Sequence, residues 1–368
     1  MSIRVFHFIL DHRIGGPHVY VQNLAQRLAP KFRSYLLTTG NREAAQIRLF
    51  NFRHLWNFLY LPEVILNLLW ILKYFWHRQS RKDVIFDVHG VGNVAPIFAA
   101  RLLGVPLVWH FHETTDRFTA LSVLGRWAAS GVPHRIVTVA KKSIEIFNLK
   151  DATLIPGAID PVFWSAKKSE STLSETAGPL RILVVSNLNP LKGIDLLLDC
   201  LEEIMAPWEL MIVGAELGTH ANYAKRLRRQ AARLESSSTI TRFLGWQSPE
   251  QIRTLMQRSD VFVLASRSEA CPLFLLEAMA AGCVSIATDV GDVREILNVR
   301  GSGFVVEIES PSALAEALKS VMNMSPNERK QMGKLAQEVA ISRYSLADQA
   351  RAHLAIYEEL INASEGKE

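Results

Sequence analysis

The sequence predicts an α/β protein made of two doubly wound parallel-sheet domains in tandem. Three observations support this prediction. The 368 residues are enough for two domains of roughly 150 residues each. Short apolar runs alternate with helical patterns through most of the chain, which is typical of βα units around parallel sheets. The stretch Pro156–Gly178 breaks this alternation and is rich in turn-forming and polar residues, as a linker would be.

The first series of βα units lies before this break. Its predicted strands are the apolar runs Ile3–Leu10, Tyr35–Thr38, Val84–His89, Leu107–His112 and Arg135–Val139. Helices are predicted at Val19–Leu28, which Pro30 closes, and at Val94–Leu103, which Gly104 follows.

The second series follows the break. Its predicted strands are Ile182–Ser186, Leu210–Val213, Arg242–Leu244, Val261–Ala265, Ser285–Thr288 and Phe304–Val306. Three further helices are expected after Pro311, Pro326 and Ser345. We place the domains at residues 1–160 and 179–368, with a linker at 161–178, and expect the last helix to pack back on the N-terminal domain. An active site is expected in a cleft between the domains, because doubly wound sheets bind ligands at the carboxyl ends of their strands.

Composition excludes several classes of protein. Apolar residues make up 49% and charged residues 21% of the chain, which excludes wholesale disorder. The three cysteines, Cys200, Cys271 and Cys283, form no CxxC pair. We therefore expect neither a disulfide scaffold nor a cysteine-rich zinc site. We expect instead that the protein works in a reducing, cytoplasmic compartment. The first residues, MSIRVFHFIL, have neither a basic region nor a small-residue cleavage site, so no secretory signal is expected.

Charge is distributed unevenly along the chain. Residues 1–160 contain 19 Lys and Arg against 10 Asp and Glu, whereas residues 161–368 contain 22 against 26. The basic half suggests an anionic partner such as a membrane or phosphates, with ordinary surface charge as the alternative. Nucleic acid is not expected as a partner, because no recognition motif accompanies the charge.

The first strand is followed by a glycine pair. Gly15 and Gly16 lie between this strand and a helix, where backbone N–H groups can approach an anion. The motif is not GxGxxG, so a dinucleotide-binding dehydrogenase is disfavoured. A plain tight turn explains the pair equally well.

The second domain carries two motifs with clearer chemistry. Lys192 lies in a loop that begins at Asn187 after the domain's first strand, where its charge can reach a phosphate. Glu269 and Glu277 lie on a loop and on the helix after it, so both can bind sugar hydroxyls at one cleft. Free N–H groups near Leu273, at the start of that helix, suit a diphosphate. A solvated lysine and solvated glutamates are the alternatives, but the apolar surroundings of Glu277 favour a role.

With these motifs the sequence resembles the retaining glycosyltransferases of family 4, which have the GT-B fold of two facing Rossmann-like domains. The resemblance rests on Glu269 and Glu277 with the Ala278–Gly282 run after them, and on Thr288–Gly291. It is supported by further matches in order along the chain: Gly15-Gly16, Pro156-x-x-Ile159-Asp160, Pro190-x-Lys192-Gly193, Val213-Gly214 and Phe243-Leu244-Gly245.

The resemblance implies a role for each residue. Glu277 would hold the nucleotide ribose and Glu269 the transferred sugar. Lys192, the Leu273 amide and the Gly16 loop would meet the diphosphate. His112 would lie near the reacting sugar, with His110 one pleat behind it on the same face. The donor domain would be the C-terminal one, and the N-terminal one would face the acceptor and the membrane.

One position departs from the family pattern. The family commonly has an arginine five residues before the lysine, where it pairs with the diphosphate, and this chain has Asn187. Arg13 and Arg117 are candidate substitutes, and an inactive or atypical enzyme remains an alternative.

The resulting hypothesis is a retaining, metal-independent glycosyltransferase without a cofactor. It would move a sugar from a UDP- or GDP-sugar to an acceptor hydroxyl on a lipid-linked or surface-polysaccharide precursor. Two alternatives remain open at this point: a sugar-nucleotide 2-epimerase with the same fold, and a non-catalytic module that binds a sugar nucleotide or a polysaccharide.

A further segment predicts where the protein works. Seventeen of the 22 residues in Leu55–Trp76 are apolar, three are tryptophans, and basic residues flank the segment. We expect an interfacial helix on an anionic membrane surface, which would make the protein peripheral on the inner face of the plasma membrane. A buried core helix is the alternative. A transmembrane span is disfavoured because Pro62, Glu63, Asn67 and Lys73 interrupt the run.

Overall fold

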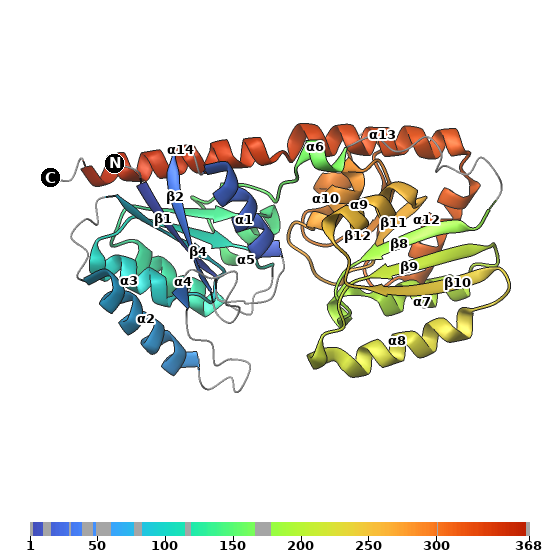
Figure 1. The fold of residues 1–368 in the computed structure, drawn as a ribbon, viewed down its shortest axis with the longest axis horizontal. Helices are drawn as coiled ribbons and strands as arrows, with labels where there is room; N and C mark the ends of the chain where they lie inside the picture. The colour runs from blue at the N-terminus through green and yellow to red at the C-terminus, as the bar shows by residue number, and fades with distance from the viewer. Residues whose placement is uncertain are drawn as a thin grey trace. The chain divides into compact units, whose positions relative to one another are not determined.

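The chain forms two compact units. Unit 1 contains Met1–Gly157 and Leu346–Glu368, and unit 2 contains Ala158–Ser345. The computed structural model (Figure 1) describes residues 3–9, 16–28, 31–38, 47–48, 60–76, 83–114, 119–165, 178–299 and 301–365. Gly15, Arg13, Arg117 and most of the predicted linker lie outside the described residues.

Unit 1 is built on a parallel sheet with the order β3-β2-β1-β4-β5-β6-β7. Its strands are β1 (Ile3–Ile9), β2 (Phe32–Thr38), β3 (Ile47–Arg48), β4 (Val84–His89), β5 (Leu107–Phe111), β6 (His134–Thr138) and β7 (Thr153–Leu154). Its helices are α1 (Gly16–Leu28), α2 (Tyr60–Trp76), α3 (Ala95–Leu103), α4 (Thr119–Ala129), α5 (Lys141–Phe147) and α14 (Leu346–Glu365).

The two faces of the unit 1 sheet differ in chemistry. On one face Phe6, Phe86 and Trp109 enter an apolar core with residues of α2, α3 and α4. Strand residues alternate between faces, so the neighbouring His7 and Asp87 point to the opposite face, which α1 and α14 cover. Figure 1 shows α14 along one side of this sheet and α2 and α3 along the other. The C-terminal helix thus completes the N-terminal sheet.

Unit 2 is built on a second parallel sheet with the order β10-β9-β8-β11-β12-β13. Its strands are β8 (Leu180–Val185), β9 (Trp208–Val213), β10 (Thr239–Gly245), β11 (Val261–Leu264), β12 (Val284–Thr288) and β13 (Phe304–Val306). Counted from β8, this is the strand order 3-2-1-4-5-6 of the doubly wound fold.

Helices cover both faces of the unit 2 sheet. They are α6 (Pro161–Trp164), α7 (Ile194–Glu202), α8 (Ala221–Leu234), α9 (Pro249–Arg258), α10 (Leu273–Ala280), α11 (Val293–Leu297), α12 (Pro311–Asn323) and α13 (Pro326–Arg343), with the 3₁₀ turns η4 (Pro190–Lys192) and η5 (Gly218–His220). Ile182 and Val184 pack with α7, α8 and α12, whereas Leu183 and Val185 pack with α9, α10 and α13. Both faces are apolar, as in a fully buried parallel sheet.

The predicted fold class, two α/β domains with doubly wound parallel sheets, is confirmed. Strand β2 begins at Phe32 rather than Tyr35, and β5 ends at Phe111 rather than His112. The two-residue strands β3 and β7 were not predicted, because so short a segment has no readable hydrophobic period.

Glycine lets two loops at the carboxyl edge of the unit 2 sheet approach each other. Gly193 lies between η4 and α7 with φ of +59°, and a Cβ placed there would lie 1.9 Å from the carbonyl oxygen of Ala265. A side chain at this position would meet both backbone strain and a backbone clash. The loop after β8 can therefore lie directly against the loop after β11.

We expect Gly193→Ala to lower the free energy of unfolding by on the order of 3 kcal/mol, because left-handed strain and the clash add. Gly245→Ala is the matched control: its φ is +66° and nothing lies within 4 Å of a Cβ there. The control should lose only roughly 1–2 kcal/mol. Urea unfolding of both variants measures the difference, and equal losses would contradict the close approach.

Candidate active site

The loop after β8 holds Lys192 beside Glu269. The Asn189 side chain accepts a hydrogen bond from the Leu191 amide at 2.9 Å and so fixes the turn η4. Lys192 Nζ then donates to Glu269 Oε1 at 2.6 Å, and Ser266 Oγ donates to the same oxygen at 2.8 Å. The two residues that the sequence motifs singled out separately therefore form one half-buried ion pair.

A second ion pair, which the sequence analysis did not predict, supports this loop. Arg267 donates to both carboxylate oxygens of Asp195, at 2.9 and 3.0 Å, and to the carbonyl of Pro190. Burial would raise the pKa of Asp195, but hydrogen bonds from Arg267 and Tyr223 outweigh burial and lower it. The ionised pair joins η4 and α7 to the loop after β11. The sequence shows an acidic residue, Asp195, near one motif and a basic residue, Arg267, near the other. Their spacing gives no indication that the two side chains meet.

Asn187 has a backbone partner. Its Oδ1 accepts a hydrogen bond from the Ala215 amide at 3.3 Å, across the loops that follow β8 and β9. This interaction holds two loops together and supplies no positive charge. Asn187 therefore does not replace the positive charge of the arginine that the family pattern has at this position.

Glu277 lies on α10 and has an unusual environment. This helix begins at Leu273 with no side-chain cap, so its first N–H groups have no intrahelical acceptor. Further along, Glu277 Oε2 is buried and has no hydrogen-bond partner among the described residues. Burial raises the pKa of Glu277 to about 8. A buried carboxyl without a partner is costly, and a ligand with hydroxyl groups would satisfy it.

In unit 1, His112 follows β5 and contacts other histidines. Its Nε2 lies 2.9 Å from Nδ1 of His89, and its backbone amide donates to Glu113 Oε2 at 3.0 Å. Desolvation and the neighbouring imidazoles hold the pKa of His112 well below its usual range. His110 is fully buried, with Nε2 at 2.6 Å from Asp87 Oδ1. Gly16 is the first residue of α1.

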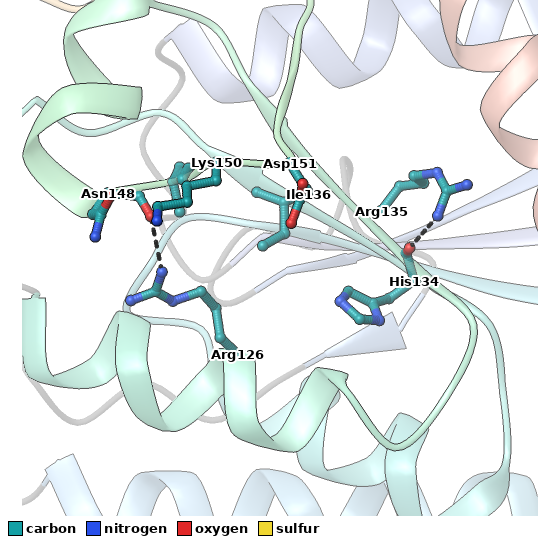
Figure 2. A pocket seen from close by; sticks show the side chains of 8 residues that line it. Arg126, His134, Arg135, Ile136, Asn148, Lys150 and Asp151 are labelled. Atoms are coloured by element: carbon teal, nitrogen blue, oxygen red, sulfur yellow. Dashed lines mark hydrogen bonds between the residues drawn. The ribbon is translucent and has the colours of Figure 1, made fainter.

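Unit 1 also has a basic pocket that the sequence did not predict. Its volume is about 590 Å³, and Arg126, His134, Arg135 and Lys150 are among its lining residues. Figure 2 shows Arg126 reaching the carbonyl of Asn148 and Arg135 the carbonyl of His134. β6 begins at His134, so the pocket lies at the amino edge of the sheet, away from the carboxyl edge that His112 follows.

Comparisons with known proteins agree with this fold and point to one class of enzyme. Residues 167–339 match the family model described as "Glycosyl transferases group 1". Residues 14–161 match the model "Glycosyltransferase Family 4". Among solved structures, Anabaena HepE in complex with UDP and glucose has a TM-score of 0.80 at 16% identity, covering 97% of this chain and 100% of that one. Sucrose-phosphate synthase from Thermosynechococcus elongatus has a TM-score of 0.82 at 15% identity, covering 98% and 100%.

Curated relatives share more of the sequence. A phosphatidyl-myo-inositol mannosyltransferase of Mycobacterium tuberculosis is 28% identical over 310 residues, which is 77% of each chain. A D-inositol 3-phosphate glycosyltransferase of Corynebacterium urealyticum is 29% identical over 181 residues, which is 48% of this chain and 42% of that protein. The match to this second relative thus spans less than half of its length.

These matches support a glycosyltransferase. More particularly, the two family models follow each other along the chain and match both units, which supports the family 4 type with the GT-B fold.

The unpartnered Glu277 predicts a pH dependence of stability. The pKa of about 8 in the folded chain lies above the ordinary value of 4.5, so the folded state retains a proton that the unfolded chain loses between these values. The stabilisation is complete below pH 4.5 and is lost as pH rises towards 8. Glu277→Gln stays neutral and should therefore exceed the wild type in stability by on the order of 2–4 kcal/mol at about pH 9, and by little at about pH 5.

Thermal unfolding at both pH values measures this difference. Glu338→Gln, at an exposed position on α13, is the control and should show no such divergence. A constant offset between Glu277→Gln and the wild type at both pH values would mean that Glu277 is ionised in the folded protein.

Proposed function

We propose that the protein transfers a sugar, with retention at the anomeric carbon, from a UDP- or GDP-sugar to an acceptor hydroxyl of a lipid-linked or surface-polysaccharide precursor. One observation carries the proposal: the loops after β8 and β11 hold the Lys192–Glu269 pair, and α10, which follows the second of these loops, has an uncapped start and the buried, unpartnered Oε2 of Glu277. The UDP and glucose bound by HepE support a nucleotide-sugar donor.

Each part of a nucleotide sugar has a counterpart at this edge. Glu277 would accept hydrogen bonds from the ribose hydroxyls and thereby gain the partner it lacks. The free N–H groups at Leu273 would bind the diphosphate, where a helix N-terminus favours an anion. Glu269 would hold the transferred sugar, and His112 would act at the reacting sugar, as the family resemblance implies.

Lys192 would stabilise the departing diphosphate. Its Nζ is now shared with Glu269 at 2.6 Å, so a bound diphosphate would compete for, or share, the same cation. Electrostatic stabilisation of the leaving group would then need no metal ion. Because Asn187 replaces the arginine of the family pattern, more of this stabilisation would depend on Lys192. Retention would follow from front-face attack, with the leaving phosphate helping to deprotonate the acceptor.

We also propose that unit 1 binds an anionic membrane surface through α2. Apolar residues lie on both sides of this helix: Ile71 and Phe75 are buried in the core beside Glu63 and Asn67, whereas Leu61, Leu69 and Trp76 are 64%, 58% and 66% exposed. In water this arrangement leaves apolar surface uncovered, and a bilayer interface would cover it. No helix in the described part of the chain is long and apolar enough to span a bilayer.

Neighbouring helices extend the apolar surface. The helices α3 and α4 pack beside α2 in sequence order and expose Leu102, Val123 and Trp127. The Arg101 guanidinium lies 4.6 Å above the Trp127 ring. An aromatic ring beside a cation suits the headgroup region of anionic lipids. A lipid acceptor is consistent with the phosphatidyl-myo-inositol mannosyltransferase relative.

The donor assignment is tested with UDP- and GDP-sugars and the variant Lys192→Ala. We expect one donor class to raise the melting temperature and to be hydrolysed slowly without an acceptor. Lys192→Ala should lower that hydrolysis by on the order of 10²–10³-fold, because one charged stabiliser of the leaving group is lost. Its melting temperature without donor should change little.

Lys330→Ala, at an exposed position on α13, is the matched control and should keep the wild-type rate. Equal rates in the two lysine variants would refute the role of Lys192. Isomerisation of the free donor would identify an epimerase, and donor binding without turnover would identify a non-catalytic module.

Membrane binding is tested by sedimentation with anionic vesicles. The Trp70 ring stacks on Tyr74 at 5.4 Å, so the informative substitutions are at the exposed positions. Leu61→Ser, Leu69→Ser and Trp76→Ser together should weaken binding by roughly tenfold or more, and added salt should weaken it further.

The matched control combines Met205→Ser and Trp246→Ser in unit 2, whose side chains are 93% and 69% exposed. This control should bind vesicles like the wild type. Absence of wild-type binding at low salt would refute the membrane proposal.

A further inference from the structure

One face of the unit 1 sheet carries imidazoles and a carboxylate where apolar residues are usual. Register explains how they meet: β1 and β4 pair His7 with Asp87, and β4 and β5 pair His89 with His110. Because alternate residues share a face, all four side chains point towards α1 and α14. We call these four residues the histidine cluster. They are between 0% and 3% exposed.

The distances within the histidine cluster are short, but the donors are not aligned. His7 Nδ1 lies 2.9 Å from Asp87 Oδ2, and His89 Nε2 lies 3.5 Å from Asp87 Oδ1. His7 Nδ1, His89 Nε2 and Asp87 Oδ1 nevertheless have no hydrogen-bond partner in the described part of the chain. Buried polar atoms that lie close to one another without an aligned hydrogen bond can instead be ligands of one cation.

The separations also suit a metal. The donor atoms of His7, Asp87 and His89 all lie within 4.8 Å of one another. Tetrahedral ligands at zinc bond lengths of about 2.0–2.1 Å are roughly 3.3 Å apart, which lies between the two measured separations.

The outer atoms of the same residues are hydrogen-bonded. His7 Nε2 lies 3.2 Å from Ser34 Oγ, His89 Nδ1 lies 2.9 Å from His112 Nε2, and Tyr357 OH donates to Asp87 Oδ2 at 2.5 Å. Metal-binding histidines usually donate their second N–H to such a partner, which fixes the tautomer and the ring orientation. His7 and His89 are thus each held through the ring nitrogen that does not face Asp87, whereas Asp87 Oδ2 both accepts the Tyr357 hydrogen bond and lies next to His7 Nδ1.

His110 does not fit the same ion. Its ring stacks on that of His89 with centroids 4.2 Å apart and an interplanar angle of 18°. Stacked rings present their lone pairs side by side, so they do not converge on one metal. His110 therefore contacts the Asp87 carboxylate, at 2.6 Å, rather than completing the ligand set.

We propose that His7 Nδ1, His89 Nε2 and the Asp87 carboxylate bind one Zn²⁺ ion. Two imidazoles and a carboxylate are a ligand set that zinc accepts. Three protein ligands leave the fourth position of a tetrahedral ion open, and the burial of all three residues keeps that position away from bulk water. The ion joins β1 to β4 and, through Tyr357, secures α14. It also sets the ring of His112, which accepts the hydrogen bond from His89. The proposal is independent of the sugar donor and the acceptor.

The experiment measures metal in the intact protein, purified without an affinity tag. We expect about one zinc per chain by mass spectrometry after gel filtration. Replacement by Co²⁺ should give the visible d–d absorption of a nitrogen- and oxygen-ligated ion, with no thiolate charge-transfer band. This measurement needs no variant, so a folding defect cannot obscure it.

Two variants locate the ion. His7→Gln should lose the zinc and the cobalt absorption, and circular dichroism checks that it folds. His134→Ala, which removes a histidine of the basic pocket outside the histidine cluster, should keep both signals. A small fraction of an equivalent of zinc together with no cobalt absorption would overturn the proposal and leave a protonated histidine as the partner of Asp87. Retention of zinc by His7→Gln would also overturn it.

Discussion

Both sheets are covered by helices on both faces, and this burial constrains every polar group that a strand carries. Water cannot reach such a group, so it needs a partner inside the protein. Unit 2 meets the constraint mainly by keeping the buried residues of β8, β9 and β11 apolar, which leaves the charged chemistry to the loops at the carboxyl edge. Unit 1 meets it differently, because β1, β4 and β5 bring His7, Asp87 and His110 to one face. The same architecture thus gives an edge site in one unit and an internal polar cluster in the other.

Charges at the carboxyl edge of unit 2 are used in pairs, with one exception. Lys192 pairs with Glu269, and Arg267 pairs with Asp195. These two pairs connect the loops after β8 and β11 without help from a ligand. Glu277 is the exception, since its buried Oε2 has no partner in the described chain. The unsatisfied Oε2 beside four paired charges supports the proposal that a ligand binds at Glu277.

Helix α2 buries two polar side chains and exposes several apolar ones, which is the opposite of what is usual for a helix in water. Glu63 and Asn67 face the protein interior together with Ile71 and Phe75, whereas Leu61, Leu66 and Leu69 are exposed. A hydrophobic pattern alone indicates which residues avoid water but not whether protein or lipid covers them. The exposed leucines on the outer side of α2 support the proposal that a lipid surface covers them.

The sequence by itself determined the two-domain α/β class, most of the strands and the edge motifs around Lys192, Glu269 and Glu277. It could do so because hydrophobic periods and loop positions are local, and because loops that follow parallel strands meet at one edge. Only the tertiary structure decided the pairing of Arg267 with Asp195 and the backbone role of Asn187. It also brought His7 to Asp87 and Tyr357 to the same carboxylate. These contacts join residues far apart in the chain, and strand register and helix docking, which no local pattern encodes, decide which of them meet.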